Sequence, residues 1–145
     1  MIALLQRISC AQVTVNNKNI AEVNAGLLVF LGLEQEDSEK QARQLLHKVL
    51  NYRLFEDKQG KMNLSISETD GDLLLVPQFT LAANTQKGLR PSFTSAASPE
   101  DAKPLFDYFV KEASGLHSTV KTGKFGADMK VQLINDGPVT FWLQT

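Results

Sequence analysis

The sequence predicts an α+β fold in which curved, antiparallel-rich sheets form a barrel-like core with two main amphipathic helices. Strand patterns occupy both ends of the chain, and two segments between them carry apolar residues at helical spacing. Strand-rich ends with helices inserted between them imply sheet and helix layers around a shared core. At 145 residues the chain is long enough for one such core, so residues 1–145 are expected to form a single domain.

The first third of the chain predicts three strands. Apolar residues recur along residues 2–15, and the polar run Asn16-Asn17-Lys18-Asn19 then gives a hairpin turn signal. Ile20–Val23 forms the expected return strand. The next apolar run, Leu27–Leu31, is continuous, which is typical of a central strand that is covered on both faces.

Two later segments predict amphipathic helices. Asp37 or Ser38 is expected to cap the first helix, and Ser98-Pro99-Glu100 starts the second with proline at its first helical position. Gly115 is expected to end the second helix, and Pro104 either kinks it or marks its true start. The apolar faces consist of Ala42, Leu45, Leu46, Val49 and Leu50 in the first helix, and of Ala102, Leu105, Phe106, Phe109, Val110 and Ala113 in the second.

The C-terminal part of the chain returns to strands. Met129–Ile134 and Val139–Gln144 are the predicted strands, and Asp136-Gly137 is the expected turn between them. Large side chains occupy both faces of the last strand, with Phe141 on one face and Trp142 on the other. Burial on both sides indicates either packed sheets or a subunit interface.

Composition limits the partners and the compartment. The formal charge is -1, and no basic run exists that could displace the counterions of a long duplex, although binding the last nucleotide or two of an RNA would need less charge. No apolar stretch reaches the roughly 18 to 20 residues of a membrane span, and residues 1–7 lack the pattern of a signal peptide. The single cysteine, Cys10, fits a reducing compartment and is expected to be half-buried, so a cytoplasmic location is expected.

Side chains suited to proton transfer or metal binding are scarce. His47 lies off the apolar stripe of the first helix and is expected to face solvent, while His117 is expected to cap the end of the second helix. Neither adjoins a nucleophile motif, so no Ser-His-Asp or Cys-His arrangement is supported. No Cys/His/Asp cluster has metal-ligand spacing and no glycine-rich phosphate loop occurs, so neither a metal nor a cofactor is expected. Catalysis would then depend on backbone groups, hydroxyls or the substrate itself.

Two short segments carry the strongest functional signal. Pro77-Gln78-Phe79-Thr80-Leu81 follows the apolar run Leu73–Val76, where a buried strand opens into a loop, and such strand ends often carry chemistry. Asn135–Thr140 contains a Gly-Pro step, which can place rigid carbonyls at a site because glycine tolerates close approach and proline fixes φ. Together these segments resemble the signature motifs of the D-aminoacyl-tRNA deacylases, and the resemblance runs from Met1 to the end.

The resemblance implies an editing hydrolase. Members of this family cleave the ester between a D-amino acid and the terminal adenosine of tRNA, act on mischarged glycyl-tRNA, and spare the L-form. The resemblance assigns the catalytic segment to Gln78, Phe79 and Thr80, with the backbone N–H groups of Phe79 and Thr80 stabilising the oxyanion. The ribose 2′-OH of the substrate would assist the attack of water, which accounts for the missing histidine base. Without a base, the Thr80 hydroxyl is given a positioning role.

The resemblance also implies a homodimer whose partner is the 3′ end of an aminoacyl-tRNA, with its terminal adenosine and attached amino acid. Gly137-Pro138 is expected to be a cis step that reaches into the partner subunit's site, where its carbonyls hold the α-amino group and an L-side chain collides. Arg7 matches a family residue that supports this step. Phe125 and Met129 are candidates to line the adenosine site, with plain core packing as the alternative for either alone.

Two positions depart from the family pattern, and other functions remain open. Pro77 stands where the family usually has serine and Gly126 where it usually has alanine, so a hydroxyl and an N–H are missing at position 77. One alternative is a non-catalytic module that binds tRNA ends or D-amino acids and is inactive through Pro77. Another is a small dimeric metabolite-binding domain with no RNA partner. The segments Gly88–Phe93 and Thr122–Met129 also resemble family segments near the pocket.

Overall fold

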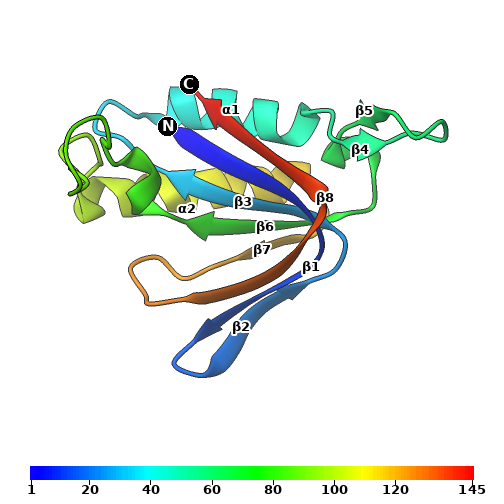
Figure 1. The fold of residues 1–145 in the computed structure, drawn as a ribbon, viewed down its shortest axis with the longest axis horizontal. Helices are drawn as coiled ribbons and strands as arrows, with labels where there is room; N and C mark the ends of the chain where they lie inside the picture. The colour runs from blue at the N-terminus through cyan, green and yellow to red at the C-terminus, as the bar shows by residue number, and fades with distance from the viewer.

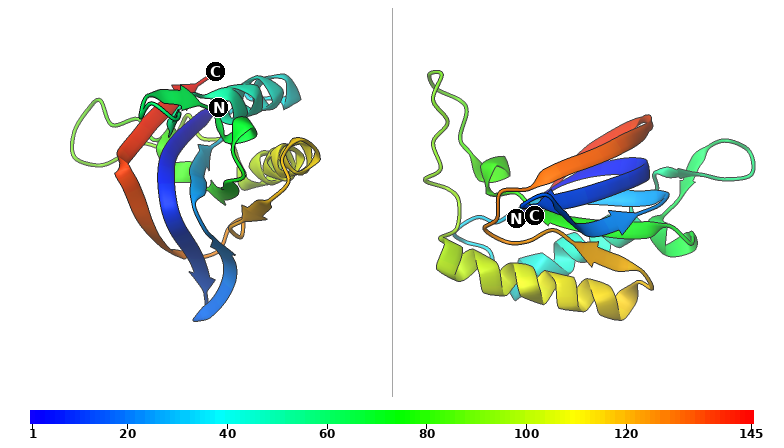
Figure 2. Two further views of the ribbon diagram at one scale, coloured as in Figure 1. Left: turned by 90° about the vertical axis from the view of Figure 1, so that its right-hand side faces the viewer. Right: turned by 90° about the horizontal axis from the view of Figure 1, so that it is seen from below.

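One mixed, strongly curved sheet of six strands forms the centre of the molecule in the computed structural model, which describes all residues from 1 to 145. The strand order is β2-β1-β3-β6-β7, and β8 pairs with β1. β1 is antiparallel to β2, β3 and β8, whereas β6 is parallel to both β3 and β7. The curvature nearly closes the sheet into a barrel (Figures 1 and 2), which confirms the predicted fold class. The strands are β1 (Ile2–Val15), β2 (Lys18–Val23), β3 (Gly26–Gly32), β6 (Asp72–Pro77), β7 (Val120–Thr122) and β8 (Lys130–Gln144).

Two helices, α1 (Glu39–Asn51) and α2 (Pro99–Leu116), lie on one side of the sheet (Figure 1). Ser38 caps α1, since its hydroxyl accepts from the backbone N–H of Lys40, and Ser98 caps α2 in the same way. The expected stop at Gly115 is wrong by one residue, because α2 ends at Leu116 with His117 as its C-cap. α2 starts at Pro99 rather than near Pro104. Neither helix is long and apolar enough to cross a membrane.

Pro104 lies inside α2 without interrupting it. Proline removes the N–H that would bond to the carbonyl four residues earlier, here that of Glu100. Both residues are exposed, so water can satisfy the freed carbonyl and the helix continues.

Buried side chains cover both faces of the central strands, as the continuous apolar run predicted. In β3, Leu27, Val29 and Leu31 pack in the main core with residues of α1 and α2. Leu28 points to the opposite face and packs in a second cluster that includes Val13 and Val23. β6 divides its side chains between the same two clusters. Because β6 is packed on both faces, the position of its carboxyl end is fixed, and so is the start of the segment that follows it.

β8 differs from the predicted pair of strands joined by a turn. It is one strand that pairs with β1 along its length, and opposite the single β1 residue Arg7 it has four residues, Asp136–Val139. The expected turn at Asp136-Gly137 is therefore wrong, because the chain loops out as a wide bulge and then continues in the same direction. The Asn135 side chain closes this bulge: its Oδ1 accepts from the Val139 N–H at 3.0 Å and its Nδ2 donates to Thr140 Oγ1 at 2.9 Å.

Cys10 is exposed rather than half-buried, so that expectation is also wrong. The pairing of β1 with β8 shifts register between Ile8 and Cys10. Ser9 and Cys10 both lie outside the core at this irregularity. The alternation of buried and exposed side chains along β1 is interrupted there, and the sequence pattern alone cannot locate such an interruption.

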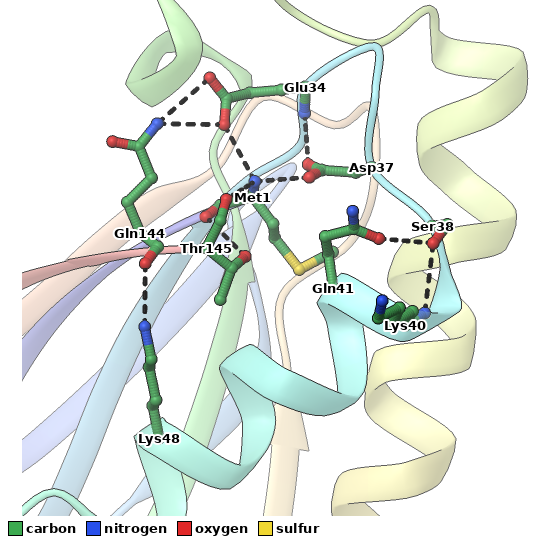
Figure 3. A network of polar contacts seen from close by, with 9 residues as sticks. All are labelled: Met1, Glu34, Asp37, Ser38, Lys40, Gln41, Lys48, Gln144 and Thr145. Carbon is green, nitrogen blue, oxygen red and sulfur yellow. Dashed lines mark hydrogen bonds and ion pairs between the residues drawn. The ribbon is translucent and has the colours of Figure 1, made fainter.

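Charged groups tie the ends of β1 and β8 to the segment that precedes α1 (Figure 3). The Met1 ammonium donates to Glu34 Oε2 at 2.9 Å and also to Asp37. Asp37 accepts from the Glu34 N–H as well, which leaves Ser38 as the helix cap. Lys48 on α1 donates to the Gln144 carbonyl at 3.1 Å. These contacts fix the exit of β3, whose last residues form part of the cavity described next.

Candidate active site

An apolar-lined cavity of about 780 Å³ opens at the carboxyl end of β6. Twelve of its eighteen lining residues are hydrophobic, a balance typical of sites that bind small organic groups. Its wall is built from four separate parts of the chain: Leu31 and Leu33 at the end of β3 and just after it, Val76–Phe79 at the end of β6, Phe93 with Ala96–Pro99 and Ala102 at the start of α2, and Phe125–Met129 before β8 with Val131 at its start.

The end of β6 places the Gln78–Thr80 segment at the mouth of this cavity. The Gln78 N–H donates to the Leu31 carbonyl at 2.7 Å, which continues the pairing with β3 past Pro77. A short 3₁₀ turn, η2 (Phe79–Ala82), follows. The Gln78 side chain donates to Thr80 Oγ1 at 2.6 Å. Gln78 and Phe79 line the cavity, whereas Thr80 lies immediately beyond its lining.

The backbone at Phe79 and Thr80 offers free hydrogen-bond donors. These are the first two residues of η2, and the first N–H groups of such a turn have no acceptor within it. The first bond inside the turn is donated by Leu81 to the Gln78 carbonyl at 3.2 Å. Two N–H groups next to each other therefore remain available to an oxygen bound at the mouth. Pro77 lacks an N–H, but it precedes both donors and does not remove either.

Aromatic and sulfur-containing side chains form the cavity walls. Phe125 and Met129 both line it and are both half-buried, as expected for residues that face a ligand site. Met129 is held by the turn before β8, where its Sδ accepts from the Lys124 N–H at 3.2 Å. On the opposite rim, Phe79 and Phe93 lie with their ring centroids 5.2 Å apart, and Phe79 is 62% exposed.

The only ionisable side chain in the cavity lining is that of Asp128. Asp128 was not predicted from the sequence as a site residue, although it belongs to the Thr122–Met129 segment, which resembles family segments near the pocket. His47 is exposed on α1 beside a separate polar hollow, and His117 bonds through Nε2 to the Gly71 carbonyl at 2.8 Å. Nowhere in the chain do three or more His, Cys, Asp or Glu side chains group closely enough to hold a metal ion.

Arg7 and the bulge of β8 form a second cluster, outside the cavity lining. The Arg7 side chain is 10% exposed. Its Nε donates to the Asp136 carbonyl at 3.1 Å, and its Nη1 donates to the Leu54 carbonyl at 3.0 Å. The guanidinium thus fixes the bulge from beneath. Arg7, Gly137 and Pro138 lie together, as the sequence predicted, but they do not line this chain's own cavity.

The tip of the bulge requires glycine. Gly137 has φ +127°, and a Cβ built there would lie 2.7 Å from Val139 Cγ2 and 3.1 Å from Arg7 Nη2. The Gly137–Pro138 peptide is cis, as expected, and Pro138 is exposed. The bulge therefore presents the bare backbone of Gly137 on the surface, next to the exposed Pro138 ring.

Comparison with known proteins shows which family the chain resembles. The family model described as D-Tyr-tRNA(Tyr) deacylase matches residues 4–144. A D-aminoacyl-tRNA deacylase of Dichelobacter nodosus (strain VCS1703A) is 58% identical over 143 residues, which is 99% of this chain and 99% of that protein. Another, of Janthinobacterium sp. (strain Marseille), is 58% identical over 144 residues, which is 99% of this chain and 97% of that protein.

Solved structures show the same fold. The structure titled "c-Myc DNA Unwinding Element Binding Protein" has a TM-score of 0.96 and 37% identity, covering 100% of this chain and 99% of that one. A probable eukaryotic D-amino acid tRNA deacylase has a TM-score of 0.86 at 18% identity, covering 98% of this chain and 97% of that one, a likeness of fold.

Taken with these relatives, the fold and the cavity define a small hydrolase of the aminoacyl-tRNA editing class. The chain belongs to the D-aminoacyl-tRNA deacylase family. The substrate of this family is D-aminoacyl-tRNA.

Proposed function

We propose that this chain deacylates D-aminoacyl-tRNA and mischarged glycyl-tRNA at the β6 cavity, using backbone and substrate groups instead of a side-chain base. The observation that carries the proposal is the composition of the cavity. Gln78 and Phe79 stand at its mouth beside two free N–H donors, whereas no His, Cys, Lys or Arg lines it. Such a site can bind an adenosine and an amino acid, but it lacks the usual proton-transfer side chain.

The proposed chemistry is ester hydrolysis through a tetrahedral intermediate. Water attacks the ester carbonyl carbon, and the resulting oxyanion accepts hydrogen bonds from the N–H groups of Phe79 and Thr80. One donor of this kind contributes about 2.7–4 kcal/mol to transition-state stabilisation. Collapse of the intermediate breaks the bond to the terminal ribose oxygen, which leaves as a hydroxyl and yields a free amino acid and tRNA. The neighbouring 2′-OH of the same ribose assists the proton movements.

Discrimination against L-aminoacyl-tRNA is assigned to the Gly137–Pro138 segment of a second subunit. The segment is exposed and lies outside this chain's own cavity lining, so a role in substrate binding requires another copy of the chain. There, its carbonyls would hold the substrate α-amino group. A rigid backbone at this position would leave room for a hydrogen but not for an L-side chain. Glycine and D-residues would pass this filter.

The outer edge of β8 supports the proposed homodimer. β8 pairs only with β1, so its other edge is free. Ile134 and Trp142 on this strand are 60% and 51% exposed, which is unusual for large apolar side chains on a monomer's edge strand. Trp142→Glu should shift the sedimentation of the protein from dimer to monomer and reduce D-aminoacyl-tRNA hydrolysis. Lys130→Glu, a change at another exposed residue at the start of the same strand, is the control.

A single-turnover assay tests the function directly. Matched D-, L- and glycyl-tRNA are compared, each with a normal terminal adenosine and with a 2′-deoxyadenosine. We expect fast release from D- and glycyl-tRNA, little from L-aminoacyl-tRNA, and a severe loss for the 2′-deoxy form. Equal rates with and without the 2′-OH would refute substrate assistance, and equal D and L rates would refute the proposed filter.

A further inference from the structure

The segments that build the cavity wall have an unusual distribution of charge. The chain contains 16 acidic residues, yet none lies in Leu73–Pro99 or in Ala113–Ala127. These two segments supply most of the cavity lining. Their ionised side chains are all cations, although the whole chain has a net charge of -1. These two segments are therefore electropositive relative to the rest of the molecule.

Three of these cations lie on segments that lead into the cavity wall. Lys87 and Arg90 are on a loop that is closed at its base by Asn84 and Ser92, whose backbones exchange hydrogen bonds of 2.7 and 3.0 Å. This loop ends at Phe93, a wall residue, and projects away from the sheet and helices (Figure 2, right). Lys124 directly precedes the wall residue Phe125.

The side chains of Lys87, Arg90 and Lys124 are exposed and have no hydrogen-bond or ion-pair partner within the chain, unlike the cations on α1 and α2 that pair with Glu39 and Asp107. Exposed, unpaired cations are free to meet an anion brought by the substrate. The two segments that carry these three cations end at the wall residues Phe93 and Phe125, so the cations can reach an anion held outside the same opening.

We propose that Lys87, Arg90 and Lys124 form a phosphate-binding rim that holds the 3′ single strand of tRNA over the cavity. This inference rests on the proposed function, in which the terminal adenosine enters the cavity. The phosphates that join this adenosine to the preceding nucleotides must then lie outside the opening, within reach of the rim. Arg90 can bind a phosphate through two N–H groups, while each lysine acts as a point charge.

Acidic residues around the same opening indicate the direction in which the 3′ strand of tRNA leaves the cavity. Asp128 lines the cavity, and Glu100 and Asp101 are exposed at the start of α2 between the wall residues Pro99 and Ala102. Phosphates would be repelled on that side. The strand is therefore expected to leave the cavity over the projecting loop and the Lys124 turn, away from α2.

The test compares full D-aminoacyl-tRNA with D-aminoacyl-adenosine, a minimal substrate that has no phosphate. In the triple variant Lys87→Ala, Arg90→Ala, Lys124→Ala, kcat/KM for the minimal substrate should stay within twofold of the parent. For full tRNA, kcat/KM should lose salt dependence, with the log–log slope falling by about 0.7 per cation removed. Between roughly 50 and 200 mM salt, the parent should lose about 20-fold more kcat/KM than the variant.

Lys130→Ala is the matched control. Lys130 is an exposed lysine between the wall residues Met129 and Val131, and alternation along β8 turns its side chain away from the side that Val131 presents to the cavity. Its slope should equal that of the parent. An unchanged slope in the triple variant, or an equal loss on both substrates, would overturn the phosphate rim. Inactivity of the parent on both substrates would instead refute the proposed function.

Discussion

Replacing Arg7 with methionine should destabilise the protein far more than the loss of an ordinary surface arginine. Arg7 lies under the β8 bulge, and its side chain is 10% exposed. Methionine has a similar length and keeps the apolar contacts of the stem, but it donates no hydrogen bond. The substitution therefore isolates the contribution of the guanidinium.

The magnitude follows from the four contacts that Arg7 makes. Its bonds to the carbonyls of Leu54 and Asp136 come from a charged donor, and such bonds contribute about 1.5–3 kcal/mol each. Its ion pairs with Glu56 and Asp136, at 3.9 and 3.5 Å, involve carboxylates that are 59% exposed and add at most about 1 kcal/mol. Water can reach the Asp136 carbonyl in the variant, whereas Leu54 is fully buried. We therefore expect a loss of about 3–4 kcal/mol, within the roughly 3–6 kcal/mol that two such bonds allow.

Urea unfolding followed by circular dichroism measures this loss as a fall in the midpoint at constant m-value. Arg43→Met is the control, because Arg43 is 54% exposed and its contacts with Glu39 and Tyr108 are open to water, so a much smaller loss is expected. Arg7→Lys keeps the charge but cannot bond to both carbonyls from a planar guanidinium, so its urea midpoint should lie between those of the parent and Arg7→Met. A change below about 1 kcal/mol for Arg7→Met, or one equal to that of Arg43→Met, would refute the reasoning.

Three further outcomes are expected. Thr80→Ala and His47→Ala should each stay within tenfold of the parent rate, because loss of a true general base costs about 10²–10⁴-fold, and a loss of that size in a folded variant would contradict the backbone mechanism. Deacylation should persist in excess chelator. Loss of activity in chelator with recovery on adding zinc would refute a mechanism that needs no metal ion. The pKa of Asp57 is lowered by hydrogen bonds from the Asn63 side chain and then from the Lys61 and Gln59 N–H groups. Its contribution to stability is therefore present above the unfolded pKa of about 3.9 and lost as pH falls through the lower folded value. Asp57→Asn should flatten the acid side of the urea-midpoint profile, and an unchanged profile would show that these bonds do not matter.

Local patterns predicted the elements whose environment is uniform along their length. The continuous run Leu27–Leu31 indicated a strand buried on both faces, and the structure divides its side chains between two clusters. Ser98-Pro99 indicated the start of α2, because a capping hydroxyl and a proline at the first helical position act within one turn. The error at Asp136-Gly137 has a different origin. An Asp-Gly pair suits both a hairpin turn and a bulge, and only the pairing of β8 with β1 chooses between them.

The sequence by itself determined the class of fold, the two candidate functional segments and the scarcity of side-chain bases, because each depends on residues close together in the chain. Tertiary structure alone decided that Gln78, Phe79, Phe125 and Met129 line one cavity, that Asp128 joins them, and that Gly137–Pro138 lies outside its lining. The cavity wall comes from four parts of the chain, and the bulge is held by a guanidinium from β1. Such groupings depend on strand pairing and sheet curvature over long sequence separations, which no local pattern encodes.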